Sequence, residues 1–327
     1  MNLLPKRPPI PVLPSLIFTG FIIGFIAVRT NFWVGLLLFF AVIILPLALL
    51  LYVYYLGAAL AIRGQFHDAI DHYSRLLNLP INKVMIYVRR AALKNAVGDI
   101  DGAIADYSAA MKHLPKEDPT LYALRSGLYL GKREFELALA DSNRLLELLP
   151  ESQIGYANRA AARMFLGDAE GAIADCNIGL EKQSSPSGKA LLYNNRGTAY
   201  RITGEYTEAM ANYNLAMSMS LSAPEKKMIH PSITTNQGIV YYVQQDFDNA
   251  RAYFQQAVNT SPTFNKALVS LAAARYKLGQ LADAQKLWLD VLKDEPRYRD
   301  SQFLLKDLNL PIEMMSDVTA LIESMTA

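Results

Sequence analysis

The side chains that most often perform catalysis are few in this 327-residue chain, and their spacing predicts no reaction. Cys176 is the one cysteine, and the four histidines do not fall at metal-binding or protease spacings such as H-E-x-x-H: they are His67, His72, His113 and His230. The sequence also holds no glycine-rich phosphate loop and no Ser/His/Asp or Cys/His constellation. It therefore predicts no enzyme, no metal site and no cofactor.

Three aspartates recur at a regular interval. Asp106, Asp141 and Asp175 follow one another at distances of 35 and 34 residues. Equal spacing over such distances indicates one position in a repeated unit rather than a catalytic pair of carboxylates. We expect these aspartates to lie on solvated helix faces or to join neighbouring repeats.

The same interval runs through most of the chain. Alanines recur at spacings of 34, 35, 34, 37, 41 and 34 residues: Ala69, Ala103, Ala138, Ala172, Ala209, Ala250 and Ala284. Twelve residues before each alanine stands a small residue: Gly57, Ala91, Ser126, Ala160, Gly197, Gly238 and Ala272. Two small residues at this offset let two antiparallel helices touch closely. The pattern therefore predicts a series of helical hairpins.

Two further positions of the repeat support these hairpins. A glycine stands five residues before the alanine in five units, where it ends the first helix, and Arg133 and Gln245 replace it in the other two. Four residues after the alanine, on the same helical face, come Tyr73, Tyr107, Ser142, Cys176, Tyr213, Phe254 and Trp288. Because Cys176 falls in this mostly large slot, we expect it to pack in the core.

With these positions the chain resembles the tetratricopeptide repeat family. The stretches Tyr87-Val-Arg-Arg-Ala and Gly98-Asp-Ile-Asp-Gly-Ala-Ile-Ala-Asp-Tyr107 match its pattern closely. The resemblance covers about seven helix-turn-helix units over residues 50–297 and implies an all-α fold, an α-solenoid. Residues 298–327 are expected to cap its open end, with a docking helix for a partner as the alternative. Their apolar stripe comprises Ile312, Met315, Val318, Leu321, Ile322 and Met325.

The resemblance also implies a ligand surface. Similar arrays bind an extended peptide or a helix on an inner surface that is lined mainly by first helices. The pattern places there Arg89, Asn95, Asn158, Met164, Phe165, Asn194, Asn195, Thr198, Arg201, Asn236, Tyr242, Lys266 and Tyr276. Chaperone-docking members grip a terminal carboxylate with basic side chains and asparagines on neighbouring first helices. In the first two units the corresponding positions are mostly apolar, so we predict no such clamp: they are Tyr54, Ala58, Val88 and Ala92.

The near-neutral net charge of the chain favours protein ligands. The chain has 32 Lys and Arg against 30 Asp and Glu, a net charge of +2, and this balance gives no reason to expect binding to nucleic acid. We expect a non-enzymatic, membrane-tethered scaffold that mediates protein–protein interaction in the assembly or stabilisation of a membrane complex. The alternative is a constitutive structural subunit of such a complex.

The N-terminal segment is strongly apolar. Residues 12–28 and 32–55 form two apolar runs, and residues 1–56 carry no charged side chain besides Lys6, Arg7 and Arg29. Because about 20 apolar residues cross a bilayer core of ~30 Å, these runs predict two transmembrane helices within residues 12–56, surrounded by membrane lipid, after an N-tail of residues 1–11. A cleaved signal peptide is the alternative.

The N-terminal runs also predict a location. Basic residues cluster after Tyr55, which favours an integral protein of the bacterial cytoplasmic membrane whose N-tail and repeats face the cytoplasm. The first repeat begins at about Leu50, inside the second apolar run. We therefore expect the second transmembrane helix to continue into the first repeat without a linker.

Overall fold

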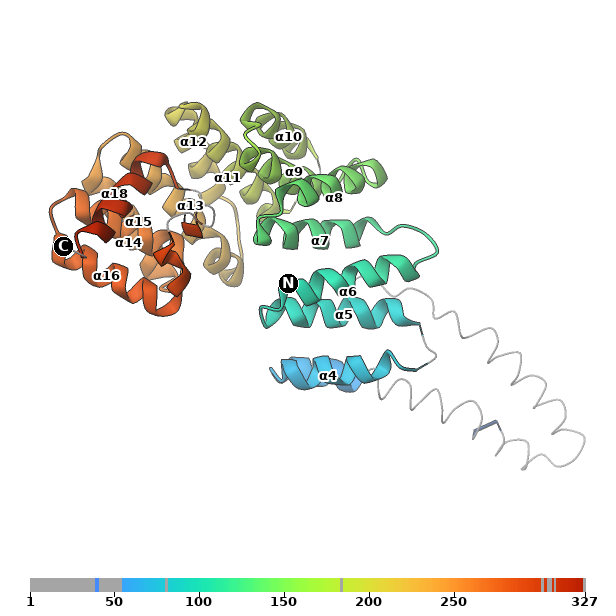
Figure 1. Cartoon of the computed structure of the whole chain (residues 1–327). Coiled ribbons are helices and arrows are strands. Elements are labelled where there is room, and N and C mark those ends of the chain that lie inside the picture. Colours follow the sequence, from blue (N-terminus) through green and yellow to red (C-terminus); the bar gives the residue numbers. More distant parts are fainter. Residues whose placement is uncertain are drawn as a thin grey trace, which may run out of the picture. The chain divides into compact units, whose positions relative to one another are not determined.

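The computed structural model describes residues 39–40, 55–79, 82–182, 185–300, 303–304, 308 and 310–325 (Figure 1). Every regular element in these residues is a helix, as the repeat pattern predicts. The chain divides into two compact units, Met1–Leu121 and Tyr122–Ala327.

The first unit is a short stack of antiparallel helices. Residues 55–62 are helical, and α4 (Phe66–Leu76), α5 (Lys83–Ala96) and α6 (Ile100–His113) follow. Helix α5 packs against both α4 and α6. Its core contains Ala69, Tyr73 and Leu76 from α4 together with Ile86 and Leu93 from α5.

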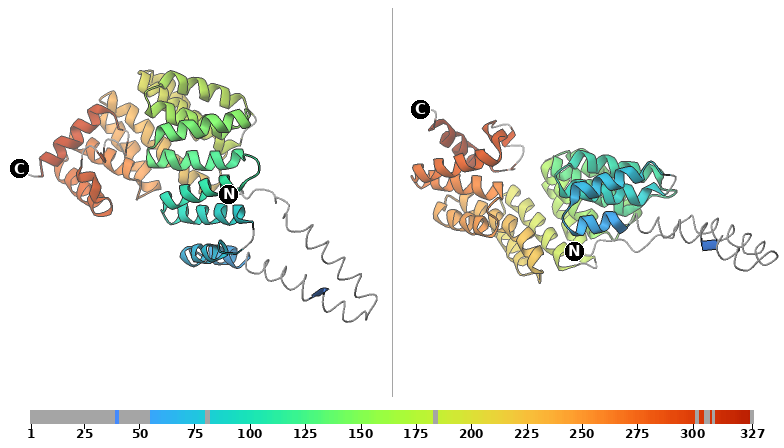
Figure 2. Two further views of the ribbon diagram at one scale, coloured as in Figure 1. Left: turned by 45° about the vertical axis from the view of Figure 1, so that its right-hand side comes forward. Right: turned by 90° about the horizontal axis from the view of Figure 1, so that it is seen from below.

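The second unit continues the same arrangement over more hairpins (Figure 2). Helix α7 (Pro119–Lys132) begins at the end of the first unit and lies mostly in the second. The helices that follow it are α8 (Phe135–Leu148), α9 (Gln153–Phe165), α10 (Ala169–Glu181), α11 (Pro186–Thr203), α12 (Tyr206–Met217), α13 (Ala223–Val243), α14 (Phe247–Thr260), α15 (Asn265–Lys277) and α16 (Leu281–Asp294). Consecutive helices from α8 to α16 pack against one another.

The turn inside each hairpin needs one residue with positive φ. The turn glycines have this left-handed conformation: Gly64, Gly98, Gly167, Gly204 and Gly279, with φ between 74° and 88°. Arg133 (φ 64°) and Gln245 (φ 65°) adopt the same conformation although they carry a Cβ, which disfavours it. The turn geometry is therefore kept even where glycine is absent.

Within a hairpin, the small residue of the first helix makes room for the large residue of the second. A Cβ added to the glycine would lie 2.6 Å from Tyr73 Cζ at Gly57, 2.8 Å from Tyr213 Cε1 at Gly197 and 2.5 Å from Phe254 Cε1 at Gly238. These distances are shorter than van der Waals contact. The close approach predicted from the repeat is thus present, and Cys176 is buried in its slot as expected.

The recurring aspartates correct one expectation from the sequence. They are buried rather than solvated, with exposed fractions of 3% at Asp106, 6% at Asp141 and 1% at Asp175. Each carboxylate accepts two hydrogen bonds from the arginine that lies 16 residues earlier on the first helix of the same hairpin: Arg90, Arg125 and Arg159. Burial is possible because each charge has a bidentate partner of opposite sign.

These arginines also connect hairpins. Arg90 Nη1 donates to Ser74 Oγ of the preceding hairpin at 2.8 Å, and Arg159 Nη1 donates to Asn143 Oδ1 at 3.2 Å. The expectation that this position joins neighbouring repeats is therefore correct. The contact is made by the arginine that pairs with the aspartate. The next hairpin keeps the arginine but has a neutral acceptor, because Arg196 Nε donates to Asn212 Oδ1 at 2.7 Å.

The row of arginines ends at α13. The corresponding residue there is Gln237, whose Nε2 donates to Asn214 Oδ1 at 2.9 Å, and in the last hairpin it is the buried Leu271. The opposing positions become Tyr253, stacked on Tyr241, and the partly buried Leu287. The interior of the second unit thus changes from charged to apolar along the chain.

After α16 the chain forms a 3-10 turn (Pro296–Arg299) and then α18 (Ile312–Glu323), which packs against α13, α15 and α16 (Figure 1). Met315, Val318 and Leu321 of the predicted stripe are buried, and Ile322 and Met325 pack at its edge. Ile312 differs from the prediction, because it is 70% exposed while Met314 is fully buried.

The predicted location in a membrane is wrong, as judged from the residues that the structure describes. No helix among them has both the length and the apolar character to cross a bilayer. The N-tail and the two predicted spans, residues 1–56, lie outside the described residues apart from 39–40 and 55–56. Near the end of the described helix 55–62, Leu60 and Ala61 pack against the core of the first hairpin, which accounts for their apolar character.

Candidate functional site

The candidate site is built on the row of first helices in the second unit. Helix α9 contacts α11, α11 contacts α13, and α13 contacts α15. We call α7, α9, α11, α13 and α15 the first-helix row. Most of the predicted ligand-surface residues lie on it, whereas Arg89 (partly buried) and Asn95 (exposed) lie on α5 of the first unit.

Three of the predicted asparagines occupy the same repeat position, two residues before the small residue. Asn158 Nδ2 donates to Ser126 Oγ at 2.7 Å and to the Ala123 carbonyl at 3.3 Å. Asn195 Nδ2 donates to the Ala157 carbonyl at 3.0 Å. These amides therefore join each first helix to the preceding one, a contact that their sequence position alone did not reveal.

The third asparagine is the centre of a polar cluster. Asn236 Nδ2 donates to Asn194 Oδ1 at 3.0 Å and to Thr198 Oγ1 at 3.4 Å, and its Oδ1 accepts from Lys266 Nζ at 3.2 Å. Thr198 Oγ1 also accepts from the hydroxyl of Tyr213 at 3.3 Å. Four predicted residues from α11, α13 and α15 are thus brought together by direct contacts.

Arg201 lies beside this cluster in a buried position. The residue is only 8% exposed, and its Nε–H has no hydrogen-bond partner among the described residues. Burial raises the pKa of Tyr213 and lowers the pKa of Lys266, and the charge of Arg201 opposes the first shift and adds to the second. A buried guanidinium N–H without an acceptor is costly, so this position needs an explanation.

A second arginine, in the turn after α7, also acts on Lys266 through its charge. Arg133 lies over the ring of Phe165, with Cζ 5.0 Å from the ring centroid, and Phe165 itself stacks on Phe135 at 4.2 Å between centroids. Burial, followed by the charges of Arg201 and Arg133, lowers the pKa of Lys266 to about 7. We call Arg133, Arg201 and Lys266 the cationic cluster.

The cationic cluster could not be found from the sequence alone. Arg133 stood out there as a residue that replaces a turn glycine, which is a signal about the backbone and not about a ligand. Its charge acts on Lys266, which lies 133 positions later in the chain, because the stacked hairpins bring their first helices together.

The remaining predicted residues have structural contacts. Met164 is buried in the core of its hairpin. Tyr242 is 2% exposed, and its hydroxyl donates to Asp317 Oδ2 of α18 at 2.6 Å. Tyr276 is partly buried against the C-terminal core. The aromatic residues of the predicted ligand surface thus contact other parts of the chain.

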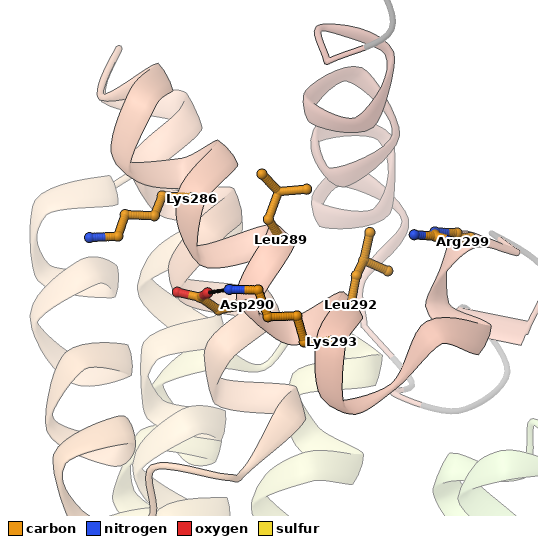
Figure 3. Close-up of a pocket in the computed structure, with 6 residues that line it drawn as sticks. All are labelled: Lys286, Leu289, Asp290, Leu292, Lys293 and Arg299. Atoms are coloured by element: carbon orange, nitrogen blue, oxygen red, sulfur yellow. Dashed lines mark hydrogen bonds and ion pairs between the residues drawn. The ribbon is translucent and has the colours of Figure 1, made fainter.

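Two further features lie outside the first-helix row. Cys176 is fully buried, and burial raises the pKa of its thiol to about 12, so the reactive thiolate is disfavoured. A shallow pocket on α16 is drawn in Figure 3, where the ammonium of Lys293 pairs with Asp290 at 2.6 Å and both side chains are exposed. No group of acidic, histidine and cysteine side chains suited to a metal ion occurs in the described residues.

The helical hairpins and their stacking define a protein of the α-solenoid class. Family models described as tetratricopeptide repeat match residues 190–222 and 243–305. The chain therefore contains tetratricopeptide repeats, as the sequence pattern indicated. A solved tetratricopeptide repeat protein from Parabacteroides merdae is 18% identical, with a TM-score of 0.55 over 79% of this chain and 92% of that one, and shows the same fold.

Curated relatives resemble parts of the chain. RNA polymerase II-associated protein 3 of Mus musculus is 30% identical over 38% of this chain, which spans 18% of that protein's length. The photosystem I assembly protein Ycf3 of Acaryochloris marina is 24% identical over 36% of this chain and 69% of its own length. Proteins with these repeats mediate protein–protein interaction and the assembly of complexes.

Proposed function

We propose that the chain is a non-enzymatic scaffold that binds a protein ligand along the first-helix row of its second unit. The observation that carries this proposal is the buried Nε–H of Arg201, which has no acceptor among the described residues and lies beside a cluster of further donors. A buried donor of this kind needs an acceptor that the described part of the chain does not supply.

The wider arrangement supports a peptide or helical ligand. First helices from four successive hairpins contribute to one polar row, and a ligand lying across them meets a repeated series of amides and hydroxyls. A series of this kind suits an extended segment better than a small molecule. The name of the Ycf3 relative, an assembly protein, agrees with a scaffold role without identifying a partner for this chain.

Site-specific crosslinking tests this proposal. A photoreactive amino acid is placed at Asn194 on the row and, as a matched control, at Leu215 of α12, a second-helix position that is 42% exposed. We expect one protein to be captured from cells at Asn194 and not at Leu215. That protein is then purified, and its affinity for the unmodified chain is measured directly.

The proposal also predicts that a substitution in the first-helix row changes this affinity. An Asn194→Arg substitution places a bulky side chain in the polar cluster and should weaken binding by at least about tenfold, which corresponds to the loss of one or two hydrogen bonds. Capture that is equal at both positions, or an affinity that Asn194→Arg leaves unchanged, would show that the ligand binds elsewhere.

A further inference from the structure

We propose that the C-terminal end of the array is an interface between two copies of this chain, in which Ile312 of each copy enters the pocket on α16 of the other. This inference goes beyond the proposed function, because it concerns a second surface and a second kind of partner. The two parts of the interface are the first turn of α18 and the pocket drawn in Figure 3, and α18 packs against α16.

The pocket has an apolar floor and a basic rim. Its volume is about 400 Å³, and Leu289 and Leu292 of α16 line it together with Lys286, Lys293 and Arg299. Figure 3 shows Arg299 extending toward Leu292 from the turn after α16. Leu289 is 52% exposed, although the outer face of a terminal repeat is expected to be polar. The pocket therefore suits an apolar side chain from outside.

The charges around the pocket favour an acidic partner. Asp290 is the one acidic side chain among the described residues that line it, and it already pairs with Lys293 at 2.6 Å. Lys286 and Arg299 form no ion pair with a described residue. Because two cations are left without a counter-ion, the pocket should attract an apolar group that has a carboxylate beside it.

The first turn of α18 presents such a group. Ile312 is 70% exposed, although it belongs to the apolar stripe of the helix, and Glu313 beside it is exposed as well. Glu313 forms no ion pair with a described residue. The next two residues, Met314 and Met315, are buried and hold this turn in place. The chain thus presents an apolar side chain next to an unpaired carboxylate.

A second copy of the chain is the occupant that these features identify. Each copy carries both the pocket and the projecting Ile312–Glu313 pair, so a twofold arrangement lets two identical contacts form at once. A closed pair also leaves neither surface free for further copies. The dimer would carry two first-helix rows and would bind a repeated ligand more tightly than one chain does.

Sedimentation velocity of the full chain over a range of concentrations tests the interface. We expect a dimer that dissociates on dilution, with no larger species. Ile312→Asp places a charge in the apolar pocket and should raise the dissociation constant at least about tenfold. Met228→Asp is the matched control, because Met228 is 73% exposed on α13 and belongs to neither surface. Circular dichroism verifies that each variant is folded.

Charge reversal tests the pairing itself. Glu313→Lys alone should weaken the dimer by about tenfold, because like charges then face each other across the interface. Adding Lys286→Glu and Arg299→Glu to the same chain makes the signs opposite again and should restore the dimer. A merely structural effect of these exposed side chains would not be reversed in this way.

A crosslink between chains locates the contact. A chain with Ile312→Cys is mixed with a chain that carries Leu289→Cys, and a short bis-maleimide should join the two. The natural cysteine does not interfere, because Cys176 is fully buried. The same mixture with Met228→Cys in place of Leu289→Cys should give no joined product.

The proposal is overturned if the chain is monomeric at every concentration, if Ile312→Asp and Met228→Asp associate equally well, or if charge reversal gives no recovery. Open-ended assemblies larger than a dimer would exclude the twofold arrangement. A monomeric chain that still captures one protein at Asn194 would leave the proposed function standing and remove only this interface.

Discussion

The hydroxyl of Tyr242 donates to Asp317 at 2.6 Å, and this hydrogen bond joins α13 to α18 across 75 positions of sequence. Asp317 also pairs with Lys277 of α15 at 3.4 Å, and Lys277 in turn lies over the ring of Phe247. Burial, followed by the hydrogen bond to Asp317 and the negative charge of Asp317, raises the pKa of Tyr242. Helix α18 is thereby held by polar contacts as well as by its apolar side.

Removing the hydroxyl should loosen α18 selectively. Tyr242→Phe keeps the ring among Phe247 and Phe254 but leaves the buried side of Asp317 without its donor, which should cost about 1–3 kcal/mol. Hydrogen exchange at the amides of α18 should accelerate while exchange in α9 and α10 stays unchanged. A uniform acceleration through the unit would mean that the bond has no local role.

The two turns without glycine predict a stabilising substitution. Gln245 has φ 65°, and relief of this conformation in Gln245→Gly should raise the free energy of unfolding by about 1 kcal/mol. The neighbouring Gln244 has φ −82°, so Gln244→Gly has no strain to relieve and should give no gain. Urea unfolding compares the two variants, and an equal response in both would contradict the explanation from strain.

Replacing glycine with alanine should have opposite effects on stability at two positions. A methyl group at Gly238 would meet Phe254 at 2.5 Å, so Gly238→Ala should destabilise the chain, with overpacking costs of about 1–3 kcal/mol outweighing the gain in helix propensity. Gly127 of α7 has open space at the same atom, and Gly127→Ala should stabilise by up to about 1 kcal/mol. Thermal unfolding of both variants tests the contrast through its sign.

The buried ion pairs predict a graded series. Asp175 accepts from Arg159 and also from Arg163 at 2.8 Å, so Asp175→Ala strands two charges and should cost about 3–5 kcal/mol. Asp175→Asn should cost less, because Asn212 already accepts from Arg196 at the same repeat position. Equal losses for the two substitutions would show that packing, and not the acceptor, determines stability here.

The lowered pKa of Lys266 predicts a dependence of stability on pH. The folded chain releases this proton near pH 7, whereas the unfolded chain keeps it to its ordinary pKa near 10.5, so the unfolded state binds more protons between these values. Stability should therefore rise with pH from 7 to 9. Lys266→Met lacks the group, and subtracting its melting temperatures from those of the natural chain should expose the rise. A flat difference would contradict it.

The sequence predicted the hairpins well because their determinants are local. A turn glycine, a small residue and a large residue at fixed offsets decide where two helices touch, and the close approach of Gly197 to Tyr213 follows from that spacing. For the C-terminal helix, the predicted buried face differs from the observed one at its first turn. Its first residue, Ile312, projects beyond the surface that α15 and α16 provide, and Met314 is buried instead.

The candidate site was only partly predictable, for a physical reason. The repeat position of Asn236 was correctly placed on a first helix, but its bonds to Asn194 and Lys266 depend on how two other helices lie against it. The aspartates were misjudged because a carboxylate at a regular interval looks solvated until its arginine is found 16 residues away. Contacts between elements carry this information, and single positions do not.

The change from charged to apolar contacts along the second unit gives its two ends different sensitivities to substitution. The hairpins around α7 to α10 contain the buried ion pairs of Asp141 and Asp175, whereas Leu271, Trp288 and their neighbours pack through apolar contacts. Removing a charge should therefore cost most in the hairpins around α7 to α10, and creating a cavity should cost most in the C-terminal hairpins. A single chain thus combines a segment held by buried charges with one held by apolar packing.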